Sequence, residues 1–285
     1  MNKIKETNST AGSNWKFEDW IEGTETDDVM YSDYWNDEEI EKEKEWYILD
    51  RDFSEMETHL DKFLLPQDLN ECFSTLKSAF NCELKGTGID LAAGNLWAAP
   101  YLLNNSDVKQ LYCLEFSKHR LISMGPKVLE HYNVPKEKIV LVYGSFYNLR
   151  LKDNSLDFVF FSQAFHHAEY PEKLLQEIDR VLKPNGIIII IGEHIISYNK
   201  AYIKHAIKYL ISTLVPDFIQ LKLFKRIFDT KTFFSKSEDL FPPDPITGDH
   251  YYTTKEYLSF FSKYNYKVKQ LKNNKTQFQS FILVK

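Results

Sequence analysis

The sequence predicts an α/β fold in which a doubly wound, mainly parallel sheet closes in an antiparallel C-terminal hairpin. Short apolar segments alternate with helical patterns from about Leu84 onward, which is typical of parallel sheets. The last two strand patterns flank Asn273–Asn274, and such a pair is a hairpin signal. We therefore divide the chain into an N-terminal arm with helices, residues 1–83, and a core, residues 84–285.

Composition places the chain among globular proteins. Its 285 residues are 43% hydrophobic and 27% charged, and no apolar run approaches the roughly 18 residues of a membrane span. The N-terminus lacks the apolar segment of a signal peptide. Cys72, Cys82 and Cys113 form no CxxC pair, so we expect free thiols and a cytoplasmic location. Because there is no concentrated basic stripe, we expect neither a nucleic-acid partner nor stable membrane insertion.

The N-terminal arm combines acidic and aromatic side chains. Residues 18–50 hold fourteen acidic side chains against Lys42 and Lys44, a net charge of −12. Aromatic residues alternate with them, namely Trp15, Phe17, Trp20, Tyr31, Tyr34, Trp35 and Trp46. A merely solvated tail would not need them, so we expect the arm from Trp15 to Tyr47 to close over a site on the core. Helical patterns follow at Asp37–Tyr47 and Ser54–Phe80.

The core alternates strands with helices. The predicted strands are Gly86–Leu91, Gln110–Leu114, Ile139–Tyr143, Leu156–Phe161 and Ile187–Ile191, and the final pair is Tyr266–Leu271 and Gln277–Val284. The predicted helices are Leu96–Leu103, Ser117–Tyr132, Pro171–Leu182 and Thr253–Tyr264. Two further amphipathic helices, Lys200–Leu214 and Pro216–Phe228, predict a helical lid at about residues 197–250.

A turn of small residues follows the first core strand. That strand ends at Asp90, and Ala92, Ala93 and Gly94 would let a ligand approach the backbone where the next helix begins. Open α/β sheets bind nucleotides at such a switch point. Glu115 closes the second strand, 21 residues after Gly94, and an acid there can accept hydrogen bonds from ribose hydroxyls.

A longer stretch carries a family resemblance. Residues 157–186 contain a His-His pair, then Pro-Glu-Lys-Leu-Leu, Glu-Ile and Arg-Val-Leu-Lys-Pro-Asn-Gly. This stretch resembles the class I S-adenosylmethionine (SAM)-dependent methyltransferases of the methyltransferase-11 group, and the resemblance extends over about Leu84–Gly192. It implies a Rossmann-like fold, SAM as the cofactor and methyl transfer as the reaction.

The resemblance also implies a cofactor site. Asp90 and Gly94 match the family's first motif, and Glu115 matches its ribose-binding acid. Ser145 stands where the family usually has an Asp for the adenine, and Ala92 stands where it usually has Gly. The cofactor-binding candidates are Asp90, Ala92, Gly94, Asn95, Glu115, Phe116, Ser145, Phe146, Ser162 and Gln163.

Candidate catalytic residues follow the fourth and fifth strands. We predict His167 as a base or substrate anchor, Glu193 as the residue that orients it or the substrate, and His166 as a further candidate. The candidate substrate contacts are His194, His250, Tyr251, Tyr31 and Tyr34. A metal site formed by His166, His167, Glu193 and His194 is conceivable, but no tight ligand spacing supports it, so we predict none.

Several functions are compatible with these features. The leading hypothesis is an enzyme that methylates a small molecule at O or N, in a specialised biosynthetic pathway. The alternatives are a SAM-fold binding or scaffold protein without turnover, and a protein or peptide methyltransferase. An NAD(P)-dependent oxidoreductase is disfavoured by the missing GxGxxG motif and by the closing hairpin. The sequence does not determine the atom that accepts the methyl group. It does not determine the oligomeric state either, and a homodimer is one option.

Overall fold

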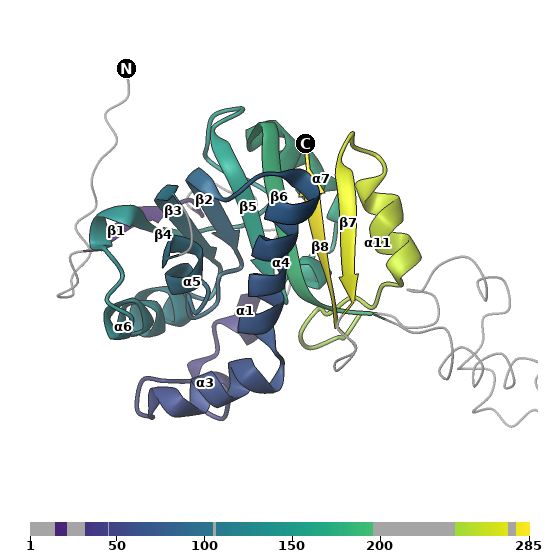
Figure 1. Cartoon of the computed structure of the whole chain (residues 1–285). Coiled ribbons are helices and arrows are strands. Elements are labelled where there is room, and N and C mark those ends of the chain that lie inside the picture. The colour runs from purple at the N-terminus through teal and green to yellow at the C-terminus, as the bar shows by residue number, and fades with distance from the viewer. Residues whose placement is uncertain (1–14, 22–31, 45, 105–106, 196–242, 273–277) are drawn as a thin grey trace, which may run out of the picture.

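The computed structural model describes residues 15–21, 32–44, 46–104, 107–195, 243–272 and 278–285. Figure 1 shows a central twisted sheet with helices on both faces. The predicted helices Lys200–Leu214 and Pro216–Phe228 lie outside the described residues. In the part of the chain that the structure describes, no helix has the length and apolar character needed to cross a membrane.

The sheet has eight strands in the order β1-β4-β3-β2-β5-β6-β8-β7. Their bounds are β1 Lys16–Asp19, β2 Lys85–Leu91, β3 Asp107–Glu115, β4 Ile139–Tyr143, β5 Leu156–Ser162, β6 Leu182–His194, β7 Lys267–Lys272 and β8 Phe278–Val284. The first six pair in parallel, whereas β8 is antiparallel to both β6 and β7. The prediction of a mainly parallel sheet with a closing antiparallel hairpin is therefore confirmed.

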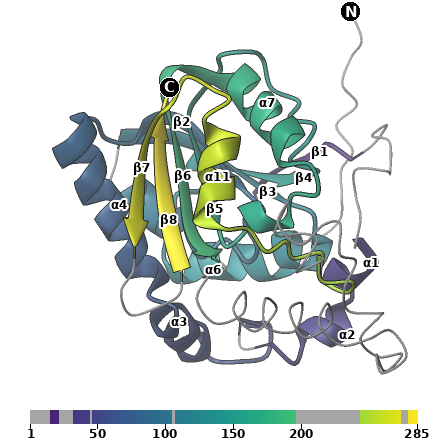
Figure 2. The same ribbon diagram turned by 90° about the vertical axis from the view of Figure 1, so that its right-hand side faces the viewer.

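Helices cover the two faces of the sheet. On one face lie α4 (Leu65–Phe80), α5 (Ala99–Asn104) and α6 (Gly125–His131), whose apolar side chains share one core cluster. On the other face lie α7 (Pro171–Val181) and α11 (Thr254–Phe261), which share a second cluster. Figure 2 shows α4 and α11 on opposite sides of the sheet. Strands covered on both faces are apolar throughout, as the all-buried run Ile188–Ile191 illustrates.

Local signals fix several helix ends. Asp52 caps α3 (Phe53–Lys62) by accepting a 2.9 Å hydrogen bond from the backbone N–H of Ser54. Thr253 and Glu256 form a reciprocal capping box at the start of α11. The predicted helix that opens at Thr253 is thereby confirmed, although it ends at Phe261 rather than at Tyr264.

Other sequence-based boundaries were also wrong. The predicted helix Ser54–Phe80 is two helices, because Leu64 adopts a left-handed conformation (φ 57°) between α3 and α4. The predicted helix Asp37–Tyr47 is only α2, Glu38–Glu41, with α1 at Ser32–Trp35 before it. Leu96 also has a positive φ (69°), so α5 begins only at Ala99. The segment 117–132 opens as a π-helix, Arg120–Met124, before α6.

Strand β1 was not predicted. It adds a parallel edge strand beside β4, with Phe17 opposite Leu141. Trp15 and Trp20, at its two ends, are buried. The first part of the arm is thus an integral part of the sheet, and the remainder can reach the carboxyl ends of the strands.

Candidate active site

A cavity of about 420 Å³ lies at the carboxyl ends of β2, β3, β4 and β5. Carboxyl ends at a switch in strand order are where open α/β sheets bind ligands. All ten residues predicted to bind the cofactor line this cavity: Asp90, Ala92, Gly94, Asn95, Glu115, Phe116, Ser145, Phe146, Ser162 and Gln163.

Glu115 holds together the turns that follow β2 and β3. One carboxylate oxygen accepts a 2.6 Å hydrogen bond from the N–H of Gly94. The other accepts hydrogen bonds from the N–H groups of Phe116 (2.8 Å) and Ser117 (2.7 Å). A carboxylate can accept about four hydrogen bonds, so the side chain has capacity left for a ligand. The turn it braces is conformationally special, since Ala92 and Gly94 both have positive φ (55° and 57°).

Asp90 is a buried carboxyl group whose oxygens have no hydrogen-bond partner among the described residues. Its side chain is 1% exposed and lines the cavity. Burial, and secondarily the charge of Glu115, raise its pKa well above the usual value. A buried unpartnered carboxyl is costly. A donor or a positive charge placed in the cavity would satisfy it.

The ends of β4 and β5 complete this side of the cavity. The hydroxyl of Ser145 accepts a 3.3 Å hydrogen bond from the N–H of Tyr147, and Phe146 lies between them in the chain. The buried hydroxyl of Ser162 has no hydrogen-bond partner among the described residues. Gln163 has a positive φ (50°), and its N–H donates to the carbonyl of Ile191 at 2.9 Å. This bond ties the turn after β5 to the neighbouring strand β6.

Glu193 does not line the cavity. It is fully buried, and it accepts five hydrogen bonds of 2.8–3.1 Å from the turn after β5 and from α11. The donors are the N–H groups of Ala164, Phe165 and His166, the Nδ1 of His166 and the hydroxyl of Tyr257. Burial alone would raise the pKa of Glu193, but His166 and these donors lower it. The geometry is that of a carboxylate that fixes the shape of a turn.

The two histidines of this turn face the cavity. They belong to a short 3₁₀ helix, Phe165–His167. Burial would lower the pKa of His166, but Glu193 raises it. Burial and the neighbouring His166 lower the pKa of His167, against the opposing effect of Asp249. His167 therefore favours the neutral form near pH 7. Its Nδ1 lies 3.0 Å from a carboxylate oxygen of Asp249, a residue that no sequence pattern had singled out.

The N-terminal arm roofs the cavity. Trp35 lines it, donates a 3.2 Å hydrogen bond from Nε1 to the carbonyl of Thr247, and contacts the ring of His167 edge-on at 5.1 Å. Asn36 joins the arm to the segment after β3, donating to the carbonyl of Phe116 (3.3 Å) and accepting from the N–H of Lys118 (2.9 Å). The arm is thus bonded to both sides of the opening.

A buried ion pair anchors this roof. Nε of Arg120 donates a 2.8 Å hydrogen bond to one carboxylate oxygen of Glu41, and Nη2 of Arg120 contacts the other carboxylate oxygen. Trp46 Nε1 donates to the same carboxylate at 2.9 Å. The guanidinium lies over the rings of Trp35 and Trp46, at 4.9 and 5.7 Å. The arm residues that line the cavity are therefore held by a contact spanning 79 positions of sequence.

The predicted substrate contacts are divided by the structure. His194 lines the cavity and contacts His166 edge-on at 5.1 Å. His250, Tyr251 and Tyr34 do not line it; His250 instead pairs with Glu169 at 3.0 Å. Tyr31 lies outside the described residues. Sequence reasoning missed several lining residues, namely Met56, His59, Leu60, Phe63, Leu65, Arg120, Glu169, Thr247 and Asp249. Of these, α3 carries three on a face that its amphipathic pattern marks as inward.

Comparisons with known proteins agree with this fold. Residues 89–190 match a family model described as a methyltransferase domain. A SAM-dependent methyltransferase from Leishmania major has a similar structure, with a TM-score of 0.53 at 13% identity over 90% of this chain and 81% of that one. For a SAM-dependent methyltransferase from Aquifex aeolicus the TM-score is 0.44 at 17% identity, over 77% of this chain and 96% of that one. No curated protein matches the sequence.

Residues 89–190 are thus a methyltransferase domain, set in a sheet of the class I type. The match supports SAM-dependent methyltransferase activity of this domain, with SAM as its cofactor. The cavity suits that cofactor chemically. Asp90 offers a buried carboxyl, without a hydrogen-bond partner among the described residues, to a ligand that carries positive charge and donor groups, and Glu115 retains acceptor capacity at the end of β3.

Proposed function

We propose that this methyltransferase acts on a small molecule at oxygen or nitrogen, and that it does so inside the roofed cavity. The observation that carries the proposal is the position of Trp35, which lines the cavity, is bonded to Thr247 and packs on His167. The space of about 420 Å³ lies within the range of small-molecule sites. A folded protein substrate would need a more open surface. We further propose a cytoplasmic enzyme of a specialised biosynthetic pathway.

In this proposal the cofactor lies along the ends of β2, β3 and β4. Glu115 accepts hydrogen bonds from the ribose hydroxyls, Asp90 faces the positively charged part of the cofactor, and Ser145 and Phe146 flank the adenine. Ser162 and Gln163 present the turn after β5. When bound, SAM supplies a methyl group on a positively charged sulfur, for in-line transfer to a nucleophile. The protein's part is to position that nucleophile and to exclude water.

The acceptor then lies beneath Trp35, beside the histidine turn. We propose His167 as the base or anchor of the acceptor, because its lowered pKa leaves the imidazole neutral near pH 7. Glu193 acts indirectly in this scheme. Its five hydrogen bonds hold the turn that carries His166 and His167, so it is a positioning residue.

The test uses SAM labelled in its methyl group, incubated with the full chain and a cell extract freed of macromolecules. We expect the label to appear in a low-molecular-weight product. Glu115→Ala should weaken SAM binding about 10–100-fold, the loss of a hydrogen bond to a charged group. His167→Gln should retain SAM binding and lower kcat at saturating SAM by about 10²-fold or more.

The control is Glu172→Ala, since Glu172 is an exposed residue of α7 outside the cavity. It should leave SAM binding and turnover as in the wild type. Label that enters only protein would contradict a small-molecule acceptor. An unchanged SAM dissociation constant in Glu115→Ala would remove Glu115 from the cofactor site.

A further inference from the structure

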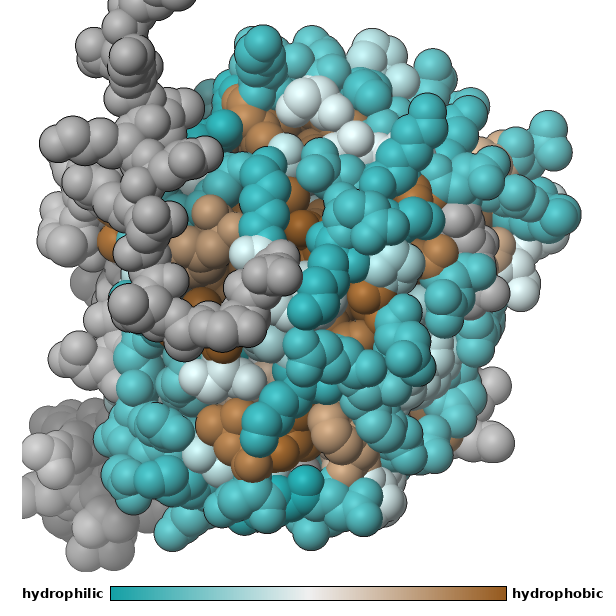
Figure 3. All heavy atoms as spheres, turned by 90° about the vertical axis from the view of Figure 1, so that its left-hand side faces the viewer, coloured by the Kyte–Doolittle hydropathy of each residue, from teal (hydrophilic) through white to brown (hydrophobic). Residues whose placement is uncertain are grey.

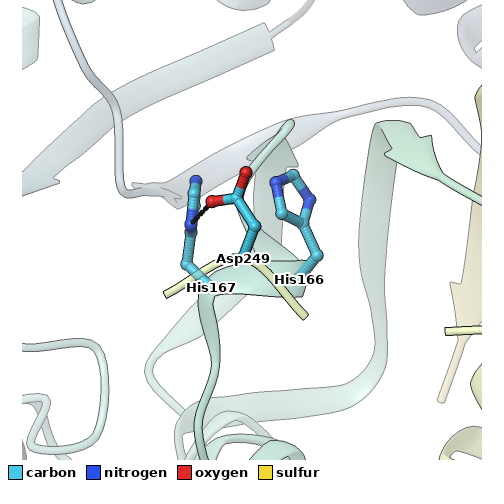
Figure 4. A group of neighbouring side chains, drawn as sticks. All are labelled: His166, His167 and Asp249. Atoms are coloured by element: carbon cyan, nitrogen blue, oxygen red, sulfur yellow. Dashed lines mark ion pairs between the residues drawn. The ribbon is translucent and has the colours of Figure 1, made fainter. Parts of the chain in front are cut away.

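His166, His167 and Asp249 form a cluster of metal-ligating side chains in the cavity wall. One ligand atom from each lies within 4.8 Å of the others. Figure 4 shows the three side chains side by side and pointing the same way, with the carboxylate of Asp249 between the two imidazole rings. We infer that they bind one divalent transition-metal ion, of the Zn²⁺ or Fe²⁺ kind. The sequence-based prediction of no metal site is thereby revised.

The contact between His167 and Asp249 is the first argument. Nδ1 of His167 and Oδ1 of Asp249 are 3.0 Å apart, yet the two buried atoms are not aligned as a hydrogen bond. Two ligand atoms that share an ion at about 2.1 Å are separated by about 3.0–3.4 Å in tetrahedral or octahedral geometry. The pair therefore has the spacing of two ligands on one ion.

The surroundings of His166 are the second argument. An ionised carboxylate can only accept, so the 3.0 Å contact from His166 Nδ1 to Glu193 makes Nδ1 the donor. In the neutral imidazole, Nε2 is then the unprotonated nitrogen that a metal requires, and metal binding would displace any proton held there. Metal-binding histidines are generally held in this way, by a carboxylate that orients the ring and fixes its tautomer. Glu193 provides that support at a position that is itself fully buried.

The segments that carry the ligands are fixed to one another. The N–H of His250 donates to the carbonyl of His166 at 2.9 Å, which places Asp249 next to the histidine turn. Tyr252 also pairs with Ile195 in a parallel bridge at the end of β6. Because the backbone is braced on both sides, the three ligand atoms are held within 4.8 Å of one another.

The donor set indicates the kind of ion. Two imidazoles and one carboxylate suit Zn²⁺, Fe²⁺ or Co²⁺, whereas Mg²⁺ and Ca²⁺ prefer oxygen ligands alone. Three protein ligands leave coordination positions open, and all three residues line the cavity. Those positions would bind the hydroxyl or amine of the acceptor, so that with the ion bound His167 would anchor the acceptor through the metal and would not act as a base. This last point rests on the proposed function, whereas the metal site itself does not.

The test measures metal binding directly. The full chain, freed of metal by a chelator, is titrated with Co²⁺ and with Zn²⁺; Co²⁺ is followed by its visible absorption and bound Zn²⁺ by elemental analysis. We expect one ion per chain. Asp249→Ala and His167→Ala should weaken binding by at least about 10–100-fold. His59→Ala is the matched control, because His59 lines the same cavity outside the cluster, and it should bind the ion as the wild type does.

Folding of each variant is checked by circular dichroism, and Asp249→Asn provides a second variant of nearly the same size. A wild-type chain that binds no stoichiometric ion, or an Asp249→Asn variant that binds as tightly as the wild type, would overturn the inference. SAM binding and methyl transfer are measured on the same samples. A chain that transfers methyl groups but binds no ion overturns the metal site alone. A chain that binds the ion without transferring methyl groups supports the metal site and contradicts the proposed function.

Discussion

At the scale of the residue, the cavity depends on backbone conformations that most side chains avoid. Ala92 and Gln163, which have side chains, adopt positive φ at two of its turns. Such conformations cost about 1–2 kcal/mol for a residue other than glycine. They persist because neighbouring contacts fix them, for example the bond from Gly94 to Glu115.

Ala92→Gly is expected to stabilise the protein. Glycine removes the strain of the positive φ (55°), and the greater freedom of the unfolded chain offsets part of that gain, which leaves about 0.5–1 kcal/mol. The measurement is the free energy of unfolding in urea. Ala93→Gly is the matched control, since Ala93 is buried and is not among the positive-φ residues; it should destabilise. If both variants lose stability equally, strain at Ala92 is excluded.

At the scale of the element, α2 is joined to the π-helix after β3 by a single buried carboxylate. Burial would raise the pKa of Glu41, but His119, Arg120 and Trp46 lower it to about 2. A carboxyl group whose pKa is depressed in the folded state stabilises that state above its unfolded pKa. This contribution is lost as the pH falls towards the folded pKa.

The pH dependence follows from those values. Between about pH 4.5 and pH 2 the folded state should lose about 3 kcal/mol through Glu41, from a depression of the pKa from 4.5 to about 2. Comparing unfolding free energies of the wild type and Glu41→Gln across this range isolates the contribution, because all other carboxyl groups are shared. The variant should be less stable near pH 7 and show a smaller acid loss. Parallel pH curves would refute the assignment.

The sequence predicted the positions of the cofactor candidates, but not the orientation of Glu193 or the long-range pairs of Asp249 and Glu41. The ten cofactor candidates all line the cavity because each lies at the carboxyl end of a strand or shortly after it, and strand ends are recognisable from local patterns. Glu193 follows a strand as well, but a strand end does not reveal which way a side chain points, and Glu193 turns into the core. Asp249 and the Glu41–Arg120 pair carried no local signal, because their partners are far away in sequence. Strand β1 is short and carries charged residues at its ends, so no apolar pattern marked it.

At the scale of the whole molecule, three distant parts of the chain meet at Trp35. The arm supplies the ring, the turn after β5 supplies His167, and the segment before α11 supplies Thr247. The cavity is therefore a product of the complete fold, and the methyltransferase domain at residues 89–190 contributes only part of its wall.

Trp35→Ala is expected to raise the KM for the acceptor about tenfold or more, because it removes a hydrogen bond and an aromatic contact that close the cavity. The dissociation constant of SAM should change much less. Steady-state kinetics and titration calorimetry separate the two effects. Glu172→Ala is the control, since Glu172 is exposed and does not line the cavity. Equal KM values for the wild type and Trp35→Ala would show that the arm does not shape the acceptor site.

The ends of the sheet have a consequence for how the protein behaves in a concentrated solution. An open sheet exposes unpaired backbone groups at its edge strands, and another chain can add to them. Here β1 closes one edge with only four residues, and Figure 3 shows hydrophilic side chains interrupted by several apolar patches on the described part of that side. At the opposite edge, β7 presents the exposed lysines 267, 269 and 272. A short strand at one edge and like charges at the other both oppose strand-by-strand aggregation.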